Sequence, residues 1–475
     1  MLEDFIIHRI KAELPFVPNE EKERLFRVLG QFLVSTQRGK AFLLKGYAGT
    51  GKTSVVSALV RALEQLQQPC ILLAPTGRAA KVLSRYAGKP AFTIHKHIYR
   101  QQQLGMEAFS IADNRHRNTL FIVDEASMIS ATRDNTLFGS GSLLDDLIKY
   151  VYSGDRCALL LLGDDAQLPP VGSTDSPALD EDRLRGYGLD LSVFRLTEVA
   201  RQEHDSGILA NATRIREQLG TLSPFSADAS RPASAFPLTY SADVQEVAGA
   251  AFLETLEDAY REAGEEETLI ITRSNKRTNL FNQGVRAHIL WKEDALSAGD
   301  RLMVSKNNYF WTQDYDDIPF LANGDMFEVV RLRREREMYG FRFADASLRA
   351  VDYAYEIECT LWLDTLTTDS PEANYALQQQ LFARIAEDYP EIHYKKEMIK
   401  KVYESPYYNA LQVRFAYAVT CHKSQGGQWK RIFLDLPQTS APAGVSLHQM
   451  SQREYLRWLY TAATRATETL YIISG

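Results

Sequence analysis

Residues 46–53 constrain the fold of this chain more than any other stretch. They read GYAGTGKT, the full pattern of a phosphate-binding loop, and they lie between an apolar run at 42–44 and a helical pattern that starts at Ser54. Such a loop lets successive backbone N–H groups face phosphate oxygens at the positive end of the helix. We therefore expect a nucleotide site here. A glycine-rich turn without a ligand is the alternative.

The positions of the loop have separate expected roles. Lys52 supplies a charge to the outer phosphates, and the Thr53 hydroxyl is placed to ligate Mg2+. The other predicted nucleotide-binding residues of the loop are Gly46, Gly49, Thr50 and Gly51.

Two adjacent carboxylates, Asp124 and Glu125, end the apolar run 120–123. The chain turns at a strand end, so Asp124 can hold the metal while Glu125 orients or deprotonates an attacking water. A solvated acidic strand end would be the commoner explanation for such a pair alone. A kinase would need a phosphate acceptor in this place, whereas a glutamate beside a metal ligand favours hydrolysis.

The sequence favours ATP over GTP. A guanine-selective switch protein would carry Asn-Lys-x-Asp, and the nearest string, residues 275–278, lacks the aspartate.

Apolar runs of strand length alternate with helical patterns, which is typical of parallel sheets with crossover helices. We predict an α/β fold with two lobes, whose strands lie at 42–44, 70–74, 120–123 and 158–162, and later at 268–272, 432–434 and 470–473. Residues 221–235 are expected to form a surface loop.

A segment of different character, roughly 295–405, interrupts the second lobe and predicts an inserted small barrel. Short strands are expected at 299–304 and 323–330, the latter with Asn-Gly turn chemistry. One helix is expected to begin at the N-cap Ser370, with Pro371 at its first position.

Composition limits the compartment and the mode of binding. No apolar run reaches the length of a bilayer span, and the first residues carry acids where a secretory signal would carry basic residues. A cytoplasmic protein with no membrane contact and four reduced, mostly buried cysteines is expected. The net charge of -7 argues against a protein that coats nucleic acid through its overall field, but it leaves a local basic groove possible.

Further strings occur in a fixed order along the chain. They are residues 74–80 (APTGRAA), 93–95 (TIH), 163–172 (GDDAQLPPVG), 196–202 (LTEVARQ), 418–426 (AVTCHKSQG) and 459–466 (LYTAATRA). From about residue 15 to the carboxyl end, the chain resembles superfamily 1 DNA helicases of the RecD/Dda branch.

The resemblance implies three regions. They are a first RecA-like lobe at 1–200 with a small insertion at about 93–118, a second RecA-like lobe at 201–294 and 406–475, and a β-rich, SH3-like accessory barrel at 295–405. It also implies that ATP and Mg2+ lie between the lobes. The expected catalytic residues are Lys52, Glu125, Gln167, Arg201 and Arg465.

The opposite face of the lobes is expected to hold single-stranded DNA through hydroxyl and imidazole contacts that do not read sequence. The residues carried over are Thr76, Thr93, His95, Thr420, His422 and Ser424, with Phe92 as an aromatic at a strand-separating pin. A structural histidine at 95 and a core phenylalanine at 92 are the alternatives.

Two other features bear on the resemblance. Relatives usually carry an adenine-reading glutamine where Lys22 stands here, which weakens the expectation of adenine selectivity. The aromatic residues 309–311 could stack bases, although barrel core is the commoner role of such a cluster.

The predicted function is that of a monomeric, ATP-driven DNA helicase that acts at single-strand/duplex junctions. Movement from 5' to 3' is implied by the family branch alone. The alternatives are a DNA or RNA translocase that remodels nucleoprotein without unwinding, and a nucleotide-gated nucleic-acid-binding scaffold.

Overall fold

The computed structural model describes most of the chain, in segments. They are residues 2–101, 109–132, 138–199, 206–222, 235–313, 315, 318, 320–368, 370–392, 394–436 and 450–474. The chain forms two compact units, the first made of residues 1–245, 424–429 and 438–470 and the second of residues 246–423, 430–437 and 471–475.

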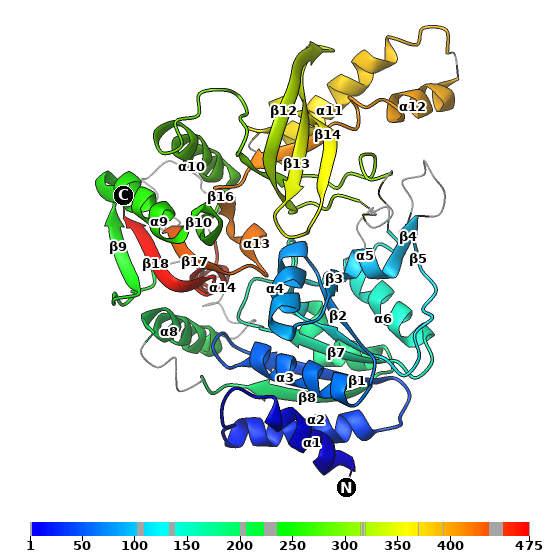
Figure 1. The fold of residues 1–475 in the computed structure, drawn as a ribbon, viewed down its shortest axis with the longest axis vertical. Helices are drawn as coiled ribbons and strands as arrows, with labels where there is room; N and C mark the ends of the chain where they lie inside the picture. The colour runs from blue at the N-terminus through cyan, green and yellow to red at the C-terminus, as the bar shows by residue number, and fades with distance from the viewer. Residues whose placement is uncertain are drawn as a thin grey trace. The chain divides into compact units, whose positions relative to one another are not determined.

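The first unit is built on a six-stranded parallel sheet (Figure 1). Its strand order is β3 (Ala91–Thr93), β2 (Cys70–Ala74), β6 (Leu120–Val123), β7 (Ala158–Gly163), β1 (Lys40–Gly46) and β8 (Asp190–Leu196). The central strands are buried along nearly their whole length, which explains their continuous apolar sequences.

Helices cover this sheet. They include α1 (Leu2–Ala12), α2 (Glu20–Val34), α3 (Lys52–Gln65), α4 (Gly77–Ala87) and α6 (Leu143–Ser153). Apolar residues of α1, α2 and α3 share one core with β1, β2, β6 and β7. A short hairpin, β4 (Tyr99–Gln101) and β5 (Phe109–Ile111), follows the small helix α5 (Ile94–Ile98).

A second sheet has the order β16 (Ala418–Thr420), β10 (Thr268–Thr272), β17 (Trp429–Asp435), β18 (Ala466–Ser474) and β9 (Val244–Ala248). The strands β16, β10 and β17 run parallel. The helix α10 (Asn275–His288) follows β10, and the side chain of Asn282 on this helix bonds to the backbone of Phe415 and Ala418.

A closed five-stranded barrel lies in the second unit. Its strands are β11 (Arg301–Val304), β12 (Met326–Met338), β13 (Phe341–Ala350), β14 (Glu356–Trp362) and β15 (Leu411–Phe415). Neighbouring pairs are antiparallel except β14 and β15, which are parallel. This parallel pair needs a crossover, and the chain supplies one between Trp362 and Leu411.

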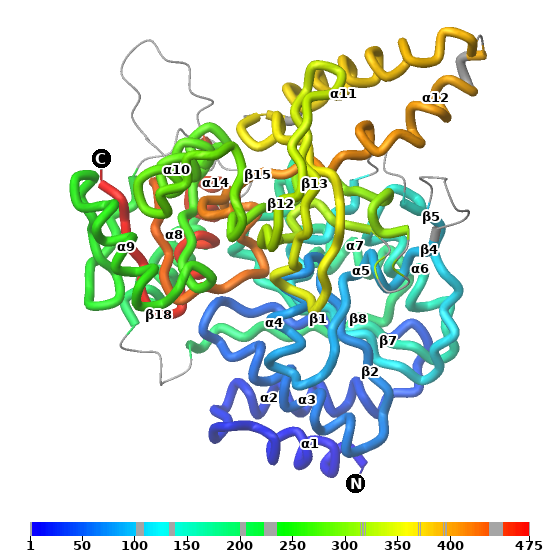
Figure 2. The backbone as a smooth tube through the Cα atoms, turned by 45° about the horizontal axis from the view of Figure 1, so that its top comes forward, coloured from blue at the N-terminus to red at the C-terminus, as the bar shows by residue number. Residues whose placement is uncertain are grey.

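Two helices, α11 (Pro371–Ala386) and α12 (Lys395–Tyr403), form that crossover and lie side by side beside the barrel strands (Figure 2). Leu381 and Ile385 of α11 and Val402 of α12 pack with the barrel residues Phe343 and Trp362. The hydroxyl of Ser370 accepts a hydrogen bond from the Ala373 N–H, which confirms the predicted start of α11.

The predicted α/β fold, its strands and the inserted barrel are confirmed. The barrel also includes β15, which lies after residue 405, the predicted end of the insert. The predicted domain boundaries stay a prediction.

All four cysteines are buried, and none forms a disulfide with another. Most of the predicted loop 221–235 lies outside the described residues. None of the helices described here has the length and apolar character that a membrane span requires.

A buried carboxylate, Asp300, connects the start of the barrel to α10. It is fully buried and forms ion pairs with Arg286, at 2.9 Å, and Lys292, at 3.1 Å. The Tyr417 hydroxyl and the Ser297 N–H also donate to it, at 2.9 and 2.8 Å. Four donors thus compensate the loss of water around one charge.

Replacing Asp300 with alanine leaves the cations of this network buried without their anion. We expect the free energy of unfolding to fall by about 3–5 kcal/mol, measured by urea denaturation. The control is Asp258→Ala, which breaks an ion pair with Arg261 in which the two side chains are 50% and 70% exposed. That change should cost about 1 kcal/mol or less, and equal effects of the two substitutions would contradict the role assigned to the buried network.

Candidate functional site

The phosphate-binding loop adopts the backbone that its glycines permit. Gly49 and Gly51 have φ values of 75° and 85°, in the left-handed region that favours glycine. Gly51 is the N-cap of α3, so the free N–H groups of that helix face the loop. The Thr50 hydroxyl donates to the Tyr47 carbonyl at 2.8 Å and closes the turn.

The Lys52 ammonium donates hydrogen bonds to two carbonyl oxygens of its own loop, those of Gly46 and, at 2.9 Å, Tyr47. Both acceptors are neutral. Phosphate oxygens placed in the loop would carry negative charge, so their bonds to the ammonium would gain a Coulomb attraction that neutral carbonyls do not provide. Lys52 can therefore exchange the carbonyls for a phosphate.

Asp124 and Glu125 follow β6 at the predicted turn. Glu125 has φ 51°, a left-handed conformation that is uncommon for glutamate, and its N–H donates to Asp124 Oδ1 at 2.8 Å. Desolvation raises the pKa of both carboxyl groups above their usual values. The nearby charges of Arg465 and Lys52 oppose the rise at Glu125, and Lys52 opposes it at Asp124.

Arg465 lies in the first compact unit, the same unit as the loop. Its guanidinium is 3.8 Å from Glu125 Oε1 and is almost fully buried. Three oxygens hold it in place, the carbonyls of Thr461 and Gly427 at 3.1 and 3.2 Å and the Thr464 hydroxyl at 3.3 Å. A rigid cation thus faces the carboxylate predicted to activate water.

Gln167 is buried, and its side-chain oxygen has no hydrogen-bond partner among the described residues. An acceptor in this state costs free energy unless a ligand or water donates to it. The next residue, Leu168, is held on both sides, since its N–H donates to the Thr461 hydroxyl at 2.8 Å and its carbonyl accepts from Gln425 at 2.8 Å.

The sequence analysis missed Tyr460. Its buried hydroxyl accepts from the Ala48 N–H at 2.9 Å and donates to Asp164 at 2.6 Å. It therefore joins α14 (Gln452–Ala463) to the phosphate-binding loop and to the end of β7. Burial raises the pKa of Asp164 above its usual value and that of Tyr460 well above its own. A tyrosine inside the string 459–466 was the sequence feature that could have pointed to this role. Its partners lie about 300 and 400 residues away along the chain, so the contacts themselves could not be predicted.

Two further arginines near the loop were also missed. Arg195 of β8 pairs with Asp165 at 2.6 Å and donates to the Tyr47 hydroxyl at 3.0 Å. Arg216 of α8 (Gly207–Thr221) lies 4.3 Å from the centre of the Tyr47 ring. Tyr47, the second residue of the loop, thus has two guanidinium neighbours. The charge of Arg195 is paired with Asp165, whereas Arg216 adds positive charge beside the phosphate site.

Lys22 lies next to the loop. A Cβ placed on Gly51 would stand 3.3 Å from Lys22 Cε, and the Lys22 ammonium lies 5.5 Å from the centre of the Phe16 ring. The residue is only 2% exposed. An ammonium has three donors and no acceptor, so it cannot accept from the adenine amino group as a glutamine does.

The predicted strand-binding residues of the first unit have structural contacts. Thr76 and Thr93 are N-caps of α4 and α5, where their hydroxyls accept from the N–H groups of Ala79 and Lys96. The ring of His95 lies 5.2 Å from that of Phe138, and burial lowers the pKa of His95 to about 4, which keeps it neutral.

Phe92 is 38% exposed, and its ring lies 6.0 Å from the ring of His97.

In the second unit, Thr420 ends β16 and lines a pocket. His422 is half-buried, and its pKa is lowered by desolvation and by the charge of Lys423. Ser424, in the first unit, is fully buried. Arg201 lies outside the described residues. The assigned roles of all these residues stay predictions.

The residues present fit a magnesium ion bound together with phosphates. Thr53 offers a hydroxyl, and Asp124 offers the carboxylate oxygen that does not accept from the Glu125 N–H. In the described part of the chain, no group of three or more histidine, cysteine or acidic side chains is arranged so that it could hold a metal ion. An ion here would complete its shell with phosphate oxygens and water, as Mg2+ commonly does.

Comparison with known proteins places these motifs in a family. Residues 31–222 match the model of an AAA domain, and residues 415–473 match the model of a UvrD-like helicase C-terminal domain. The two matches bring together the loop, the acidic pair and Gln167 in the first and Arg465 in the second. The chain therefore combines an AAA domain with a UvrD-like helicase C-terminal domain.

Relatives of this chain include three proteins of different lengths. ATP-dependent RecD2 DNA helicase of Deinococcus radiodurans is 31% identical over 161 residues, 33% of this chain and 20% of that protein. ATP-dependent DNA helicase dda of Enterobacteria phage T4 is 31% identical over 179 residues, 36% of this chain and 37% of that protein. An uncharacterized protein of Methanocaldococcus jannaschii is 23% identical over 96% of this chain. The chain spans only 38% of that last relative's own length.

The Tyr460 hydroxyl generates a prediction. In Tyr460→Phe the Ala48 N–H loses its acceptor and buried Asp164 loses a donor, so the free energy of unfolding should fall by about 1–3 kcal/mol in urea denaturation. Tyr47→Phe is the control, because its hydroxyl bonds to the exposed Arg195. The free energy of unfolding of the control should be close to that of wild type. An equal loss of stability in both variants would show that the buried Tyr460 hydroxyl makes no special contribution.

Proposed function

We propose that this chain is an ATP-dependent DNA helicase that hydrolyses ATP at the phosphate-binding loop and moves along single-stranded DNA. The observation that carries the proposal is the 3.8 Å approach of Arg465 to Glu125, in the same compact unit as the loop. A protein that only held a nucleotide would need neither a water-activating carboxylate nor a guanidinium beside it.

The side chains divide the chemistry of hydrolysis. Lys52 binds the outer phosphates, and Glu125 takes a proton from the attacking water. The partnerless oxygen of Gln167 accepts from that water or from a group bound to it. Arg465 stabilises the negative charge of the transition state, a role that is worth on the order of 10³–10⁵ in rate in related phosphoryl-transfer systems. Mg2+ held by Thr53 and Asp124 would neutralise charge on the phosphates.

The contacts of the site suggest how hydrolysis is coupled to movement. Thr461, Gln425 and Gly427 hold Leu168 and Arg465, and the same segment contains Ser424 of the motif predicted to contact the strand. A shift of the γ-phosphate that moves Gln167 would therefore reach residues of that motif. Alternating grip on the strand converts such shifts into steps.

The strand-binding residues of this proposal are those predicted from the sequence, with hydroxyl and imidazole contacts to the DNA backbone. RecD2 and dda are named as ATP-dependent DNA helicases, which supports DNA as the substrate. Binding at single-strand/duplex junctions, the monomeric state and movement from 5' to 3' belong to the same proposal.

Turnover of ATP with and without single-stranded DNA tests the function. We expect DNA to stimulate hydrolysis by wild type, and we expect Lys52→Ala to lose hydrolysis because the outer phosphates lose their cation, while DNA binding is retained. Duplexes with a single-stranded tail at either end then report unwinding and its direction.

Three results would contradict parts of the proposal. If Lys52→Ala still hydrolysed ATP, the assignment of the nucleotide site to the phosphate-binding loop would be wrong. If DNA stimulated ATP hydrolysis but neither tailed duplex were unwound, the protein would be a translocase. If RNA alone stimulated ATP hydrolysis, it would be an RNA motor. Binding of ATP without turnover would indicate a nucleotide-gated scaffold.

The charge of Arg465 generates a pH prediction. Glu125 must be ionised to act as a base, and its pKa is raised by desolvation, so kcat/KM should fall as the pH decreases through that raised value. The Arg465 charge opposes the rise. In Arg465→Gln the pKa of Glu125 should increase further, and the acid limb of the kcat/KM profile of the residual activity should move to higher pH.

Arg465→Lys is the matched control, because it keeps a positive charge near Glu125 and should leave the acid limb close to its wild-type position. A limb that moves equally in both variants would mean that the charge of Arg465 does not set the ionisation of Glu125.

A further inference from the structure

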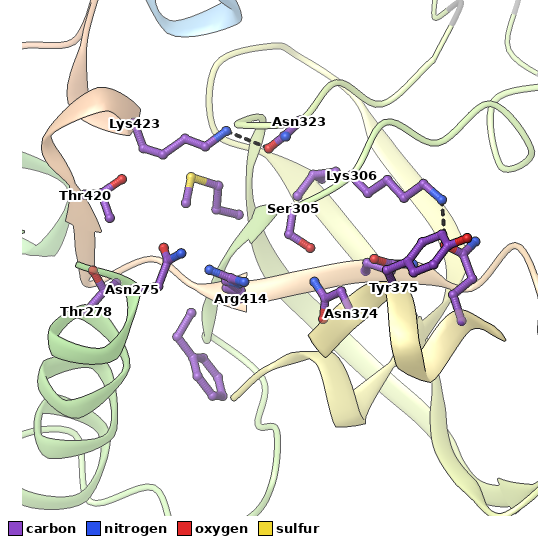
Figure 3. A pocket seen from close by; sticks show the side chains of 15 residues that line it. Asn275, Thr278, Ser305, Lys306, Asn323, Asn374, Tyr375, Arg414, Thr420 and Lys423 are labelled. Carbon is purple, nitrogen blue, oxygen red and sulfur yellow. Dashed lines mark hydrogen bonds between the residues drawn. The ribbon is translucent and has the colours of Figure 1, made fainter. Parts of the chain in front are cut away.

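A pocket of about 330 Å³ opens in the second unit, close to Thr420 but formed largely by other elements. Figure 3 shows Asn275, Thr278 and Thr420 on one side, Asn374 and Tyr375 of α11 on the other, and Arg414 between them. The volume is at the small end of the range for ligand pockets, which is roughly 300–1,000 Å³. The barrel strands β11 and β15 supply further lining residues.

The lining is positively charged in a chain whose net charge is -7. Its charged members are Lys306, Arg414 and Lys423, and none of the described residues that line the pocket is aspartate or glutamate. Amide oxygens orient two of these cations, since Lys306 donates to Gln378 at 2.8 Å and Lys423 donates to Asn323 at 2.6 Å. The local charge therefore selects an anion.

One carboxyl group acts on Lys423 from outside the pocket lining. Desolvation raises the pKa of Asp325 to about 7. At neutral pH this carboxyl group is therefore only partly ionised. Desolvation and the charge of Arg414 lower the pKa of Lys423 to about 8, so most of this lysine is still protonated at neutral pH.

Two polar atoms in the pocket point to a ligand that forms hydrogen bonds. Asn374 Oδ1 and Ser305 Oγ are buried and have no hydrogen-bond partner among the described residues. Both residues line the pocket. Buried groups of this kind are costly unless a ligand satisfies them, and the amino, imino and carbonyl groups of a base edge can do so.

Two further features favour a nucleotide. The first turns of α10 and α11 both contribute lining residues, and helix N-termini favour negative charge. Tyr375 lines the pocket and is 65% exposed, so its ring is available to a base, and stacking on aromatic side chains is the common sequence-tolerant contact in single-strand binding.

We propose that this pocket binds one nucleotide of the single strand, with the base against Tyr375, Asn374 and Ser305 and the flanking phosphates against Lys306, Arg414 and Lys423. This inference rests on the proposed function and adds a strand contact made by the helical crossover of the barrel. Apart from Lys423, which lies in the motif at 418–426, it assigns binding roles to residues outside the helicase motifs, and it adds base contacts to backbone contacts.

Equilibrium binding of a labelled oligothymidylate, followed by fluorescence anisotropy without ATP, tests the pocket. Loss of one stacked base costs about 1–3 kcal/mol, so Tyr375→Ala should weaken binding by about 5- to 150-fold. Asn374→Ala should also weaken it. An oligonucleotide of the same length built from abasic sites has no base to lose, and on it Tyr375→Ala should bind as wild type does.

The salt dependence of binding tests the cationic residues of the pocket separately. Lys423→Ala should weaken binding of both strands and should reduce the slope of log affinity against log salt by about 0.7, the value for one phosphate contact on a single strand. The control for all variants is Tyr394→Ala, which removes a tyrosine that is 77% exposed at the start of α12 and does not line the pocket. The control should bind both strands as wild type does.

Failure of the inference and failure of the proposed function are distinguishable. If wild type binds oligothymidylate but Tyr375→Ala and Asn374→Ala bind equally well, the pocket is not a strand contact and the helicase function stands. If Tyr375→Ala loses affinity equally for the abasic strand, base stacking is overturned. If wild type binds neither strand, the proposed function itself fails.

Discussion

The parallel arrangement of β6, β7 and β1 is the constraint on which the nucleotide site depends. Parallel neighbours bring their carboxyl ends to the same edge of a sheet, and ligands of open α/β sheets bind at that edge. The loop after β1, the acidic pair after β6 and Asp164 after β7 therefore lie close together although they are far apart in the sequence. Register between buried strands fixes their separation.

Hydrogen bonds from the carboxyl-terminal part of the chain complete the site. The Tyr460 and Thr461 side chains bond to Ala48 and Leu168, and Arg465 is held against Glu125 by carbonyls on two segments. The Tyr460 and Thr461 bonds join the phosphate-binding loop and the segment after Gln167 to α14. In the function proposed above, these buried pairs give a change at the phosphates a physical route to the motif that contains Ser424.

Some structural features could be predicted from sequence because they are set by nearby residues. The loop at 46–53 is defined by its own glycines, and the strands at 120–123 and 158–162 by continuous apolar sequence. The start of α11 is defined by Ser370 and Pro371. Other features could not be predicted. The side chain of His95 lies among aromatic rings, Ser424 is fully buried, and residues 411–415 pair within the barrel, because partners distant in sequence decide each outcome.

The sequence by itself determined the presence of a phosphate-binding loop, a carboxylate pair and an arginine motif, since these depend on residue type and short spacing. Only the tertiary structure decided that Tyr460 bridges Asp164 and the loop, that Arg465 approaches Glu125, and that α11 forms a basic pocket with β11 and β15. Those contacts join segments separated by tens to hundreds of residues. Their geometry comes from packing of strands and helices, which local sequence does not encode.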